Sequence, residues 1–136
     1  MKPIALDAMG GDHAPKVTVE GALLAQKQGI PVVLVGPTER LQRELAAQGG
    51  HLPVVEAPEH ITMQDHATDV RKKRRASINV CMELLRRGEA SAVVSMGHTG
   101  ATLASALFNL GRIPGVDRPT LLIELPSERG RTYLAA

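Results

Sequence analysis

Two short glycine-bearing segments carry the residues best suited to chemistry. The first, Asp7-Ala8-Met9-Gly10-Gly11-Asp12, follows the apolar run Ile4-Ala5-Leu6 and precedes a helix predicted to begin near Pro15. Adjacent glycines allow a tight turn whose N–H groups can approach an anion closely. Because α/β proteins bind ligands just past the carboxyl ends of strands, this loop is a candidate anion site. It offers substrate-binding glycines and orienting carboxylates, namely Gly10, Gly11, Asp7 and Asp12.

A second segment, Ser95-Met96-Gly97-His98-Thr99-Gly100-Ala101, lies between the apolar run Ala92-Val93-Val94 and a predicted helix. Its N–H groups would converge at a helix N-terminus, where the macrodipole favours an anion. A purely structural interpretation is equally open, in which Thr99 caps the helix and the glycines permit close packing. Neither segment matches the P-loop or dinucleotide-binding glycine patterns. The candidate substrate ligands are Ser95, Gly97, Thr99 and Gly100. His98, and equally His13 beside the first segment, is a candidate general base.

The third candidate is the basic run Arg71-Lys72-Lys73-Arg74-Arg75, which is followed by Ser77. A solvated charged face is the commonest fate of such a run. The alternatives are contact with nucleic acid and a site for phosphate or an acidic partner, in which Arg71 binds phosphate oxygens through its planar guanidinium. Ser77 could cap the next helix and direct its N-terminus at the same anion. The run therefore offers Arg71 and Lys73 as positive charges for a reaction on an anion.

Composition narrows the class of function. The 136 residues include one Phe, one Tyr and no Trp, which argues against recognition of nucleic acid by base stacking. A net charge of +2 creates no strong field for nucleic acid or anionic lipid. The single cysteine, Cys81, fits a reducing compartment and the apolar stripe of a helix. The histidines lack metal-ligand spacing, and no apolar run reaches the roughly 20 residues of a membrane span. We therefore predict a cytoplasmic protein that binds neither nucleic acid nor a metal.

Short β-branched runs alternate with helical patterns, which indicates an α/β protein. The runs are continuously apolar, as expected for buried strands of a parallel sheet, and they comprise residues 4–6, 32–35, 54–55, 92–94 and 121–123. Apolar spacing predicts helices around three sets of residues: Leu41 and Leu45; Ile78, Cys81, Met82 and Leu85; Leu103, Leu107 and Leu110. Right-handed crossovers then give a three-layer α/β/α fold with a mostly parallel, doubly wound sheet.

Three segments do not follow this alternation of strand and helix patterns. Residues 57–76 have no clean period, and residues 112–119 are rich in turn formers. Long irregular loops in compact domains are usually functional or mobile. Residues 132–136 resemble the beginning of another buried strand. We therefore expect residues 1–136 to be an incomplete part of a single α/β domain.

Together, these segments closely resemble the N-terminal part of the PlsX family, the bacterial phosphate acyltransferases of phospholipid synthesis. The matching segments, in family order and spacing, are Asp7-Ala8-Met9-Gly10-Gly11-Asp12, Ile61-Thr62-Met63, Val70-Arg71-Lys72-Lys73 with Ser77, Ser95-Met96-Gly97-His98-Thr99-Gly100-Ala101, and residues 111–119. The chain departs from the family at His98, where Asn is usual, and at residues 67–69, which lack a family proline. Family members also continue well beyond this length. The resemblance therefore implies that residues 1–136 are the N-terminal part of a single α/β acyltransferase domain, and hence an incomplete enzyme.

The resemblance implies transfer of a long-chain acyl group from acyl carrier protein to inorganic phosphate, which gives an acyl phosphate. It further implies a fold similar to that of phosphate acetyltransferases and isocitrate dehydrogenases, a homodimer, peripheral membrane association and no cofactor. Phosphate attacking a thioester needs an anion cradle, positive charge and donors for the oxyanion. The two glycine loops would supply the cradle and donors, and Arg71, Lys73 and Arg118 would supply the charge.

Two other functions remain open at this point. A short-chain phosphotransacylase acting on coenzyme A thioesters would need the same loops. A non-catalytic module would instead use the basic run to bind acidic carrier protein or lipid headgroups, with an affinity that falls as salt is added. A nucleic-acid role is a distant third.

Overall fold

Four parallel strands form the centre of the computed structural model, which describes all 136 residues. In order across the sheet they are β3 (Val54–Glu56), β2 (Val32–Gly36), β1 (Ile4–Asp7) and β4 (Ala92–Val94). β1 pairs with both neighbours, so that Leu6 lies opposite Leu34 on one side and Val94 on the other. The first four predicted strands and the predicted parallel sheet are thereby confirmed.

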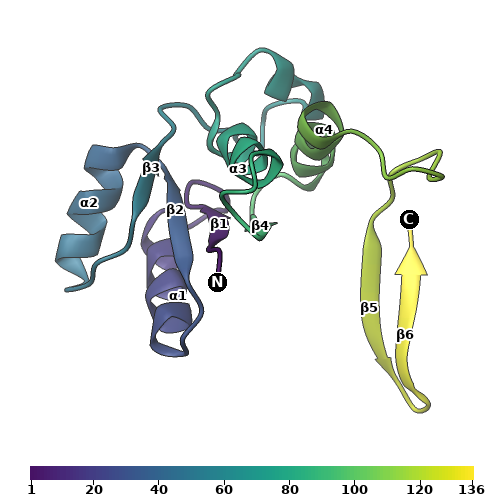
Figure 1. Cartoon of the computed structure of the whole chain (residues 1–136), viewed down its shortest axis with the longest axis horizontal. Helices are drawn as coiled ribbons and strands as arrows, with labels where there is room; N and C mark the ends of the chain where they lie inside the picture. The colour runs from purple at the N-terminus through teal and green to yellow at the C-terminus, as the bar shows by residue number, and fades with distance from the viewer.

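Helices cover both faces of the sheet, because alternate residues of a strand point to opposite sides. α1 (Lys16–Lys27) and α2 (Thr38–Ala47) pack on the face that carries Leu6 and Leu34. α3 (Ser77–Arg86) packs on the opposite face, where Cys81 joins Ala5 and Val33 in a second apolar cluster. Figure 1 shows the resulting layers of helix, sheet and helix, which confirm the predicted α/β fold.

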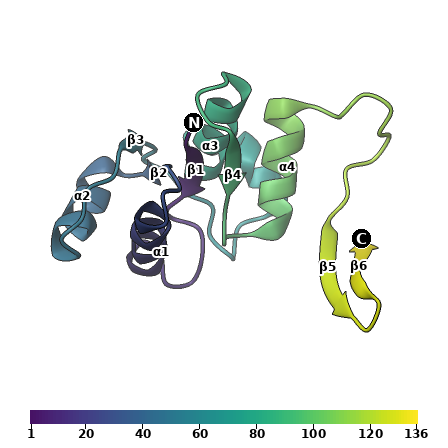
Figure 2. The same ribbon diagram turned by 60° about the horizontal axis from the view of Figure 1, so that its bottom comes forward.

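The strand order makes the sheet doubly wound. From β1 the chain moves outward through β2 to β3, and then returns to place β4 on the other side of β1. The order therefore reverses between β1 and β4, and folds of this kind bind ligands at the carboxyl ends of the two strands that flank such a reversal. Figure 2 shows β1 and β4 side by side, and both glycine segments begin where these strands end.

A third apolar cluster lies beside the sheet. Here α4 (Thr99–Leu110) packs against α3 and against the short 3-10 helix η1 (Ala67–Arg71), and the cluster includes Val70, Met82 and Ala101. The predicted α4 helix is confirmed, but small residues rather than its leucines face α3, since Ala101 and Ser105 are the buried positions. Leu103, Leu107 and Leu110 instead line an apolar groove of about 470 Å³ against the segment that follows α4.

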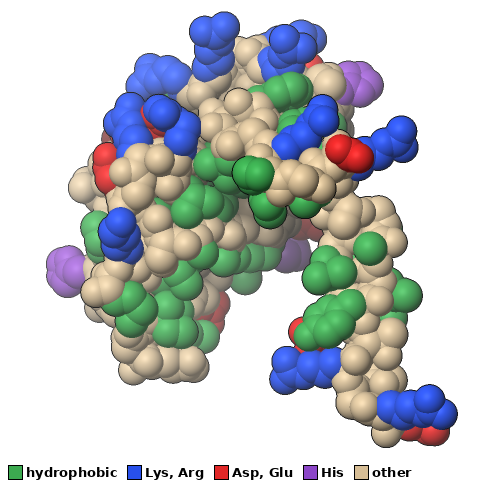
Figure 3. Space-filling model, turned by 45° about the vertical axis from the view of Figure 1, so that its right-hand side comes forward, with side chains coloured by type: hydrophobic (Ala, Val, Ile, Leu, Met, Phe, Trp, Pro, Cys, Tyr) green, Lys and Arg blue, Asp and Glu red, His purple; other side chains and the backbone are tan.

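The last two strands correct the sequence-based prediction. β5 (Leu122–Ser127) and β6 (Gly130–Ala135) do form, but they pair with each other as an antiparallel hairpin and do not join the parallel sheet. Every residue of both strands is exposed, so neither residues 121–123 nor residues 132–136 form the buried strand that was expected. Their apolar character misled the prediction, because it fits a two-sided ribbon as well as a buried strand. Figure 3 shows hydrophobic side chains lining the hollow between this hairpin and the body of the protein.

Candidate functional site

A buried carboxylate joins three segments at the point where the strand order reverses. Oδ1 of Asp7, the last residue of β1, accepts hydrogen bonds from the Ser77 hydroxyl at 2.5 Å and from the Met9 N–H at 3.3 Å. Oδ2 accepts one from the Ser95 hydroxyl at 2.8 Å. Asp7 is only 5% exposed and has no cationic partner. Because a buried charge is costly unless it is hydrogen-bonded, these donors fix where α3 and the end of β4 must lie.

The negative charge of Asp7 also affects the pKa of a thiol in the core, that of Cys81. Burial, and after it the negative charge of Asp7, raises the pKa of the Cys81 thiol. Cys81 is fully buried on α3 and stays protonated, so it is unsuited to act as a nucleophile. This agrees with its interpretation as a core residue.

The two glycine loops touch each other through their backbones. We call residues 8–14 the β1 loop and residues 95–98 the β4 loop. A Cβ added to Gly10 would lie 2.8 Å from Oδ2 of Asp7, 2.8 Å from Oγ of Ser95 and 2.9 Å from the Gly97 nitrogen. A Cβ added to Gly97 would lie 3.1 Å from the Gly10 Cα. The glycines are therefore required by this close approach, in addition to any role toward a ligand.

The β4 loop is organised from within. The Ser95 Oγ accepts a hydrogen bond from the Gly97 N–H at 3.1 Å while it donates to Asp7, so the Gly97 N–H is not free for an anion. His98, and not Thr99, is the N-cap of α4, because its Nδ1 accepts the Ala101 N–H at 3.1 Å. This corrects the expectation that Thr99 caps the helix. The N–H groups of Thr99 and Gly100 have no acceptor within the protein and remain available.

Ser77 does not cap α3 as the sequence suggested. It is the first residue of that helix, and Ala76 occupies the N-cap position without a side-chain hydrogen bond. The Ser77 side chain is 1% exposed and its hydroxyl donates to Asp7, so it is directed into the protein rather than toward a ligand. Its geometry is that of a residue that positions Asp7.

A polar pocket of about 260 Å³ opens beside the two loops. Gly11 and Asp12 of the β1 loop and Gly97 of the β4 loop form one side, and residues 60–64 form the other. Arg40 of α2 completes the lining. Gly11 has a φ of 112°, which side-chain-bearing residues rarely adopt, and this turn brings the β1 loop into the pocket wall. We call this cavity the switch-point pocket.

Lys73 holds the far wall of the switch-point pocket in place. Its ammonium lies 2.8 Å from Oδ2 of Asp65 and donates to the His60 carbonyl at 3.3 Å. The same Asp65 oxygen accepts the N–H of Thr62 at 2.7 Å. The hydrogen bond from Lys73, followed by that from the Thr62 backbone, holds the pKa of Asp65 well below its ordinary value of 3.8. Lys73 therefore organises the segment that contains residues 60–65, and it does not itself line the pocket.

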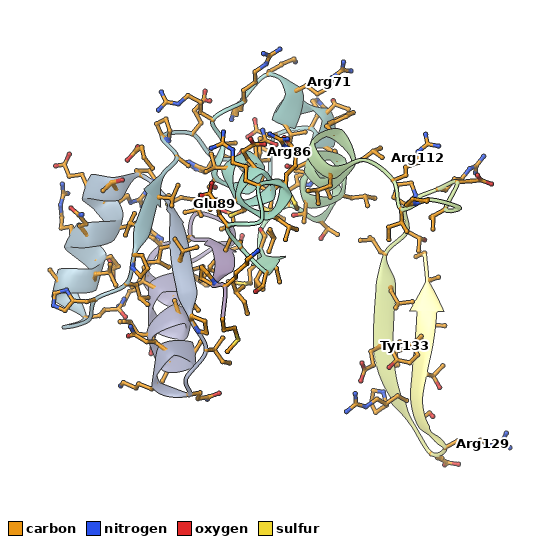
Figure 4. The ribbon with its side chains drawn as sticks, viewed as in Figure 1. Arg71, Arg86, Glu89, Arg112, Arg129 and Tyr133 are labelled. Atoms are coloured by element: carbon orange, nitrogen blue, oxygen red, sulfur yellow. The ribbon has the colours of Figure 1, made fainter.

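The other two predicted positive charges lie away from the glycine loops. The Arg71 guanidinium sits 5.2 Å from the centre of the Phe108 ring of α4, and Figure 4 shows it at the edge of the molecule. Arg118 lies in the turn-rich segment after α4, at the apolar groove. Neither side chain lines the switch-point pocket.

Sequence reasoning missed Arg40 and His60, which do line it. Arg40 looks like any solvated arginine on an amphipathic helix, and His60 falls in the aperiodic stretch between residues 57 and 76. No spacing connects either residue with the glycines, so only the fold brings them together. No cluster of three or more His, Cys, Asp or Glu side chains in the chain could hold a metal ion. None of the helices has the length and hydropathy needed to cross a lipid bilayer.

Comparison with known proteins places this architecture in a family. A family model described as "Fatty acid synthesis protein" matches residues 2–135. The chain is 60% identical over 131 residues to a phosphate acyltransferase of Thermus thermophilus, an alignment that covers 96% of this chain and 40% of that protein. It is 54% identical to a phosphate acyltransferase of Deinococcus radiodurans, with 97% and 38% covered, and 52% identical to one of Pelotomaculum thermopropionicum, with 96% and 40% covered.

The fold and the site define a class: doubly wound α/β proteins with a glycine-walled polar pocket where the strand order reverses. Within that class, this chain belongs to the PlsX family of fatty acid synthesis proteins. It spans about 40% of the length of the curated relatives it matches and corresponds to their N-terminal part. The resemblance seen in the sequence is thereby confirmed.

Proposed function

We propose that this chain forms the N-terminal part of a phosphate acyltransferase, which moves a fatty acyl group from acyl carrier protein to inorganic phosphate. One observation carries the proposal. Two glycine loops meet on the buried Asp7 at the reversal of strand order, in a chain that is 60% identical to a protein named phosphate acyltransferase. Expected features that follow from the resemblance alone, a homodimer and peripheral association with the membrane, belong to the same proposal.

The reaction sets clear demands on the site. An oxygen of phosphate attacks the thioester carbonyl carbon, a C–O bond forms, and the C–S bond breaks to release the carrier-protein thiolate, which takes up a proton. Phosphate is itself the nucleophile, so no acyl-enzyme is needed. The protein must hold the phosphate near the carbonyl and stabilise the charge that develops on the carbonyl oxygen.

The N-terminus of α4 is suited to stabilise the negative charge that develops on the carbonyl oxygen. The N–H groups of Thr99 and Gly100 have no internal acceptor, and the helix macrodipole adds partial positive charge at that end. We assign these two donors to the developing oxyanion. His98 caps the same turn through Nδ1 and so keeps the two N–H groups in place.

The exposed arginines of the basic run suit the acidic carrier protein. Arg74 and Arg75 are exposed and take part in no ion pair, and Figure 3 shows Lys and Arg side chains gathered along the upper edge of the molecule. Replacing Arg74 and Arg75 by Glu should weaken binding of acyl carrier protein and flatten its salt dependence. Arg43→Glu, at an ion-paired site on α2, is the matched control. Unchanged affinity in the double variant would exclude docking at this run.

The enzymatic proposal is tested by phosphate-dependent release of thiol from acyl carrier protein. The assay should use the 136-residue chain and, in parallel, a full-length relative in which this chain replaces the matched segment. Acyl-coenzyme A with a short chain serves as the competing donor. Phosphate-dependent release from the carrier protein supports the proposal, and preference for the coenzyme A donor would favour a short-chain phosphotransacylase. Absence of release from either donor, in both proteins, would defeat the proposal.

A further inference from the structure

The switch-point pocket combines several unpaired hydrogen-bond donors. The N–H groups of Gly11 and Asp12 have no acceptor anywhere in the protein. Gly11 adopts the positive φ at which successive N–H groups can point to one side and form a concave anion site. Gly11 and Asp12 line the same cavity as Arg40. Residues with free donors thus come from two elements that are distant in the sequence and border one small space.

Arg40 is the one guanidinium in the pocket lining, and it has no carboxylate partner. Its neighbour Arg43 on the same helix is paired with Glu39 at 2.9 Å. The basic residues that the sequence offered for the reaction are engaged elsewhere, Lys73 with Asp65 and Arg71 with Phe108. An unpaired guanidinium at a cavity with free N–H groups is suited to bind an oxyanion through two parallel hydrogen bonds.

Two further residues of the switch-point pocket, His60 and Asp12, carry polar side chains that can interact with a bound anion. His60 is half-buried in the opposite wall, where the Lys73 ammonium fixes its carbonyl. Asp12 is exposed at the rim. A carboxylate repels a fully ionised anion but accepts a hydrogen bond from a protonated one. Phosphate keeps a proton at neutral pH and sulfate does not, so Asp12 would distinguish the two ions.

We propose that Arg40, His60 and the Gly11 and Asp12 N–H groups form the subsite for inorganic phosphate, with Asp12 selecting its protonated form. This inference rests on the proposed function, since it names the site of the nucleophile. It moves the positive charge of the reaction from Arg71, Lys73 and Arg118 to Arg40. Lys73 then acts on the substrate through the wall that it positions.

The test is a titration of the full 136-residue chain with inorganic phosphate, followed by the backbone amide signals in nuclear magnetic resonance spectra. Phosphate should shift the Gly11 and Asp12 amides and bind more tightly than sulfate at the same ionic strength. Arg40→Ala should weaken phosphate binding about tenfold to a hundredfold, as expected for loss of hydrogen bonds to a charged group. Arg43→Ala should bind like the wild type.

Two further variants test the role of the Arg40 guanidinium geometry and the selectivity assigned to Asp12. Arg40→Lys keeps the charge without the two-pronged geometry and should bind with intermediate affinity, and Asp12→Asn should reduce the preference for phosphate over sulfate. Dispersed amide spectra show that each variant is folded. The inference is overturned if phosphate does not bind, if Arg40→Ala and Arg40→Lys both bind it like the wild type, or if the shifts gather around Arg71 or Arg118. Equal affinity for a phosphodiester, the group that links a carrier protein to its prosthetic arm, would overturn the assignment to free phosphate.

These experiments test the phosphate subsite and the proposed function independently, so that either one can be refuted alone. If phosphate binds as described but the full-length chimera shows no acyl transfer, the proposed function fails and the subsite stands. If acyl transfer occurs while Arg40→Ala leaves the KM for phosphate unchanged, the proposed function stands and the subsite fails.

Discussion

The Oγ atom of Ser77 lies 2.5 Å from Oδ1 of Asp7, although 70 residues separate them in the sequence. The other carboxylate oxygen accepts the hydroxyl of Ser95, which is 88 residues away. Asp7 therefore ties the end of β1 to the start of α3 and to the end of β4. We infer that this carboxylate sets the positions of both glycine loops, and that its part in the reaction is to position them.

The Ser77 hydrogen bond should contribute measurably to stability. Ser77→Ala removes a donor from a buried charge, which typically costs about 1.5–3 kcal/mol of the free energy of unfolding. Ser91→Ala is the matched control, because the Ser91 hydroxyl is exposed and bonds only to backbone carbonyls. Its effect should stay within about 0.5 kcal/mol. Urea unfolding of the two variants measures the difference, and equal losses would contradict a special role for Asp7.

Gly10 should tolerate no side chain. The Cβ of alanine would meet Asp7, Ser95 and the Gly97 backbone at less than 3 Å, and overpacking of this kind costs about 1–3 kcal/mol. Gly21→Ala, in the middle of α1 with no atom within 4 Å of the new Cβ, should instead stabilise the protein by about 0.5–1 kcal/mol. Thermal unfolding of both variants gives the comparison. A Gly10→Ala protein as stable as the wild type would show that the two loops do not touch as described.

His98 should be replaceable by the residue usual in the family. Its Nδ1 accepts the Ala101 N–H, and an asparagine Oδ1 can accept the same hydrogen bond at an N-cap. We therefore expect His98→Asn to retain stability and His98→Ala to lose about 1 kcal/mol. Chemical denaturation separates these outcomes. If activity were lost in a stable His98→Asn protein, the imidazole would have a chemical role that capping does not explain.

The Asp65 ion pair predicts a defined pH dependence. Because the hydrogen bond from Lys73 lowers the pKa of Asp65 below its ordinary 3.8, the folded state binds a proton here less readily than the unfolded chain. The stabilisation is therefore fully present well above pH 3.8 and is lost as the pH falls below that value. Asp65→Asn should be less stable than the wild type at pH 7, and the gap should close below pH 3.8. Asp117→Asn, at an exposed site without an ion pair, should show no such gap.

Sequence patterns predicted the local elements more completely than the site. Continuous apolar runs identified β1, β2, β3 and β4, and the glycines marked both loops, because these features depend on neighbours in the chain. The contact between Gly10 and Gly97 depends instead on β4 returning to pair with β1, which no spacing reveals. Ser77 shows why long-range contacts could not be predicted. A serine at the start of a helix has the same sequence pattern whether it caps the helix or bonds to a distant carboxylate.

Charge was harder to interpret than hydropathy. The basic run was predicted to be a binding site because its charges are adjacent, yet Lys73 pairs with Asp65 and Arg71 with an aromatic ring. Arg40 was not predicted to be a site residue, although the fold places it at the pocket. The prediction for the apolar C-terminal strands was wrong because an exposed hairpin and a buried strand can share the same apolar residues.

We propose above that the switch-point pocket brings phosphate to an acyl thioester. The most direct test of this proposal is ³¹P nuclear magnetic resonance of the full-length chimera with acyl carrier protein loaded with a fatty acid, in the presence and absence of phosphate. We expect an acyl phosphate signal to appear as thiol is released, and we expect neither without phosphate or with Gly10→Ala. Release of thiol and free fatty acid at the same rate in phosphate-free buffer would identify a thioesterase and contradict the proposed transfer to phosphate.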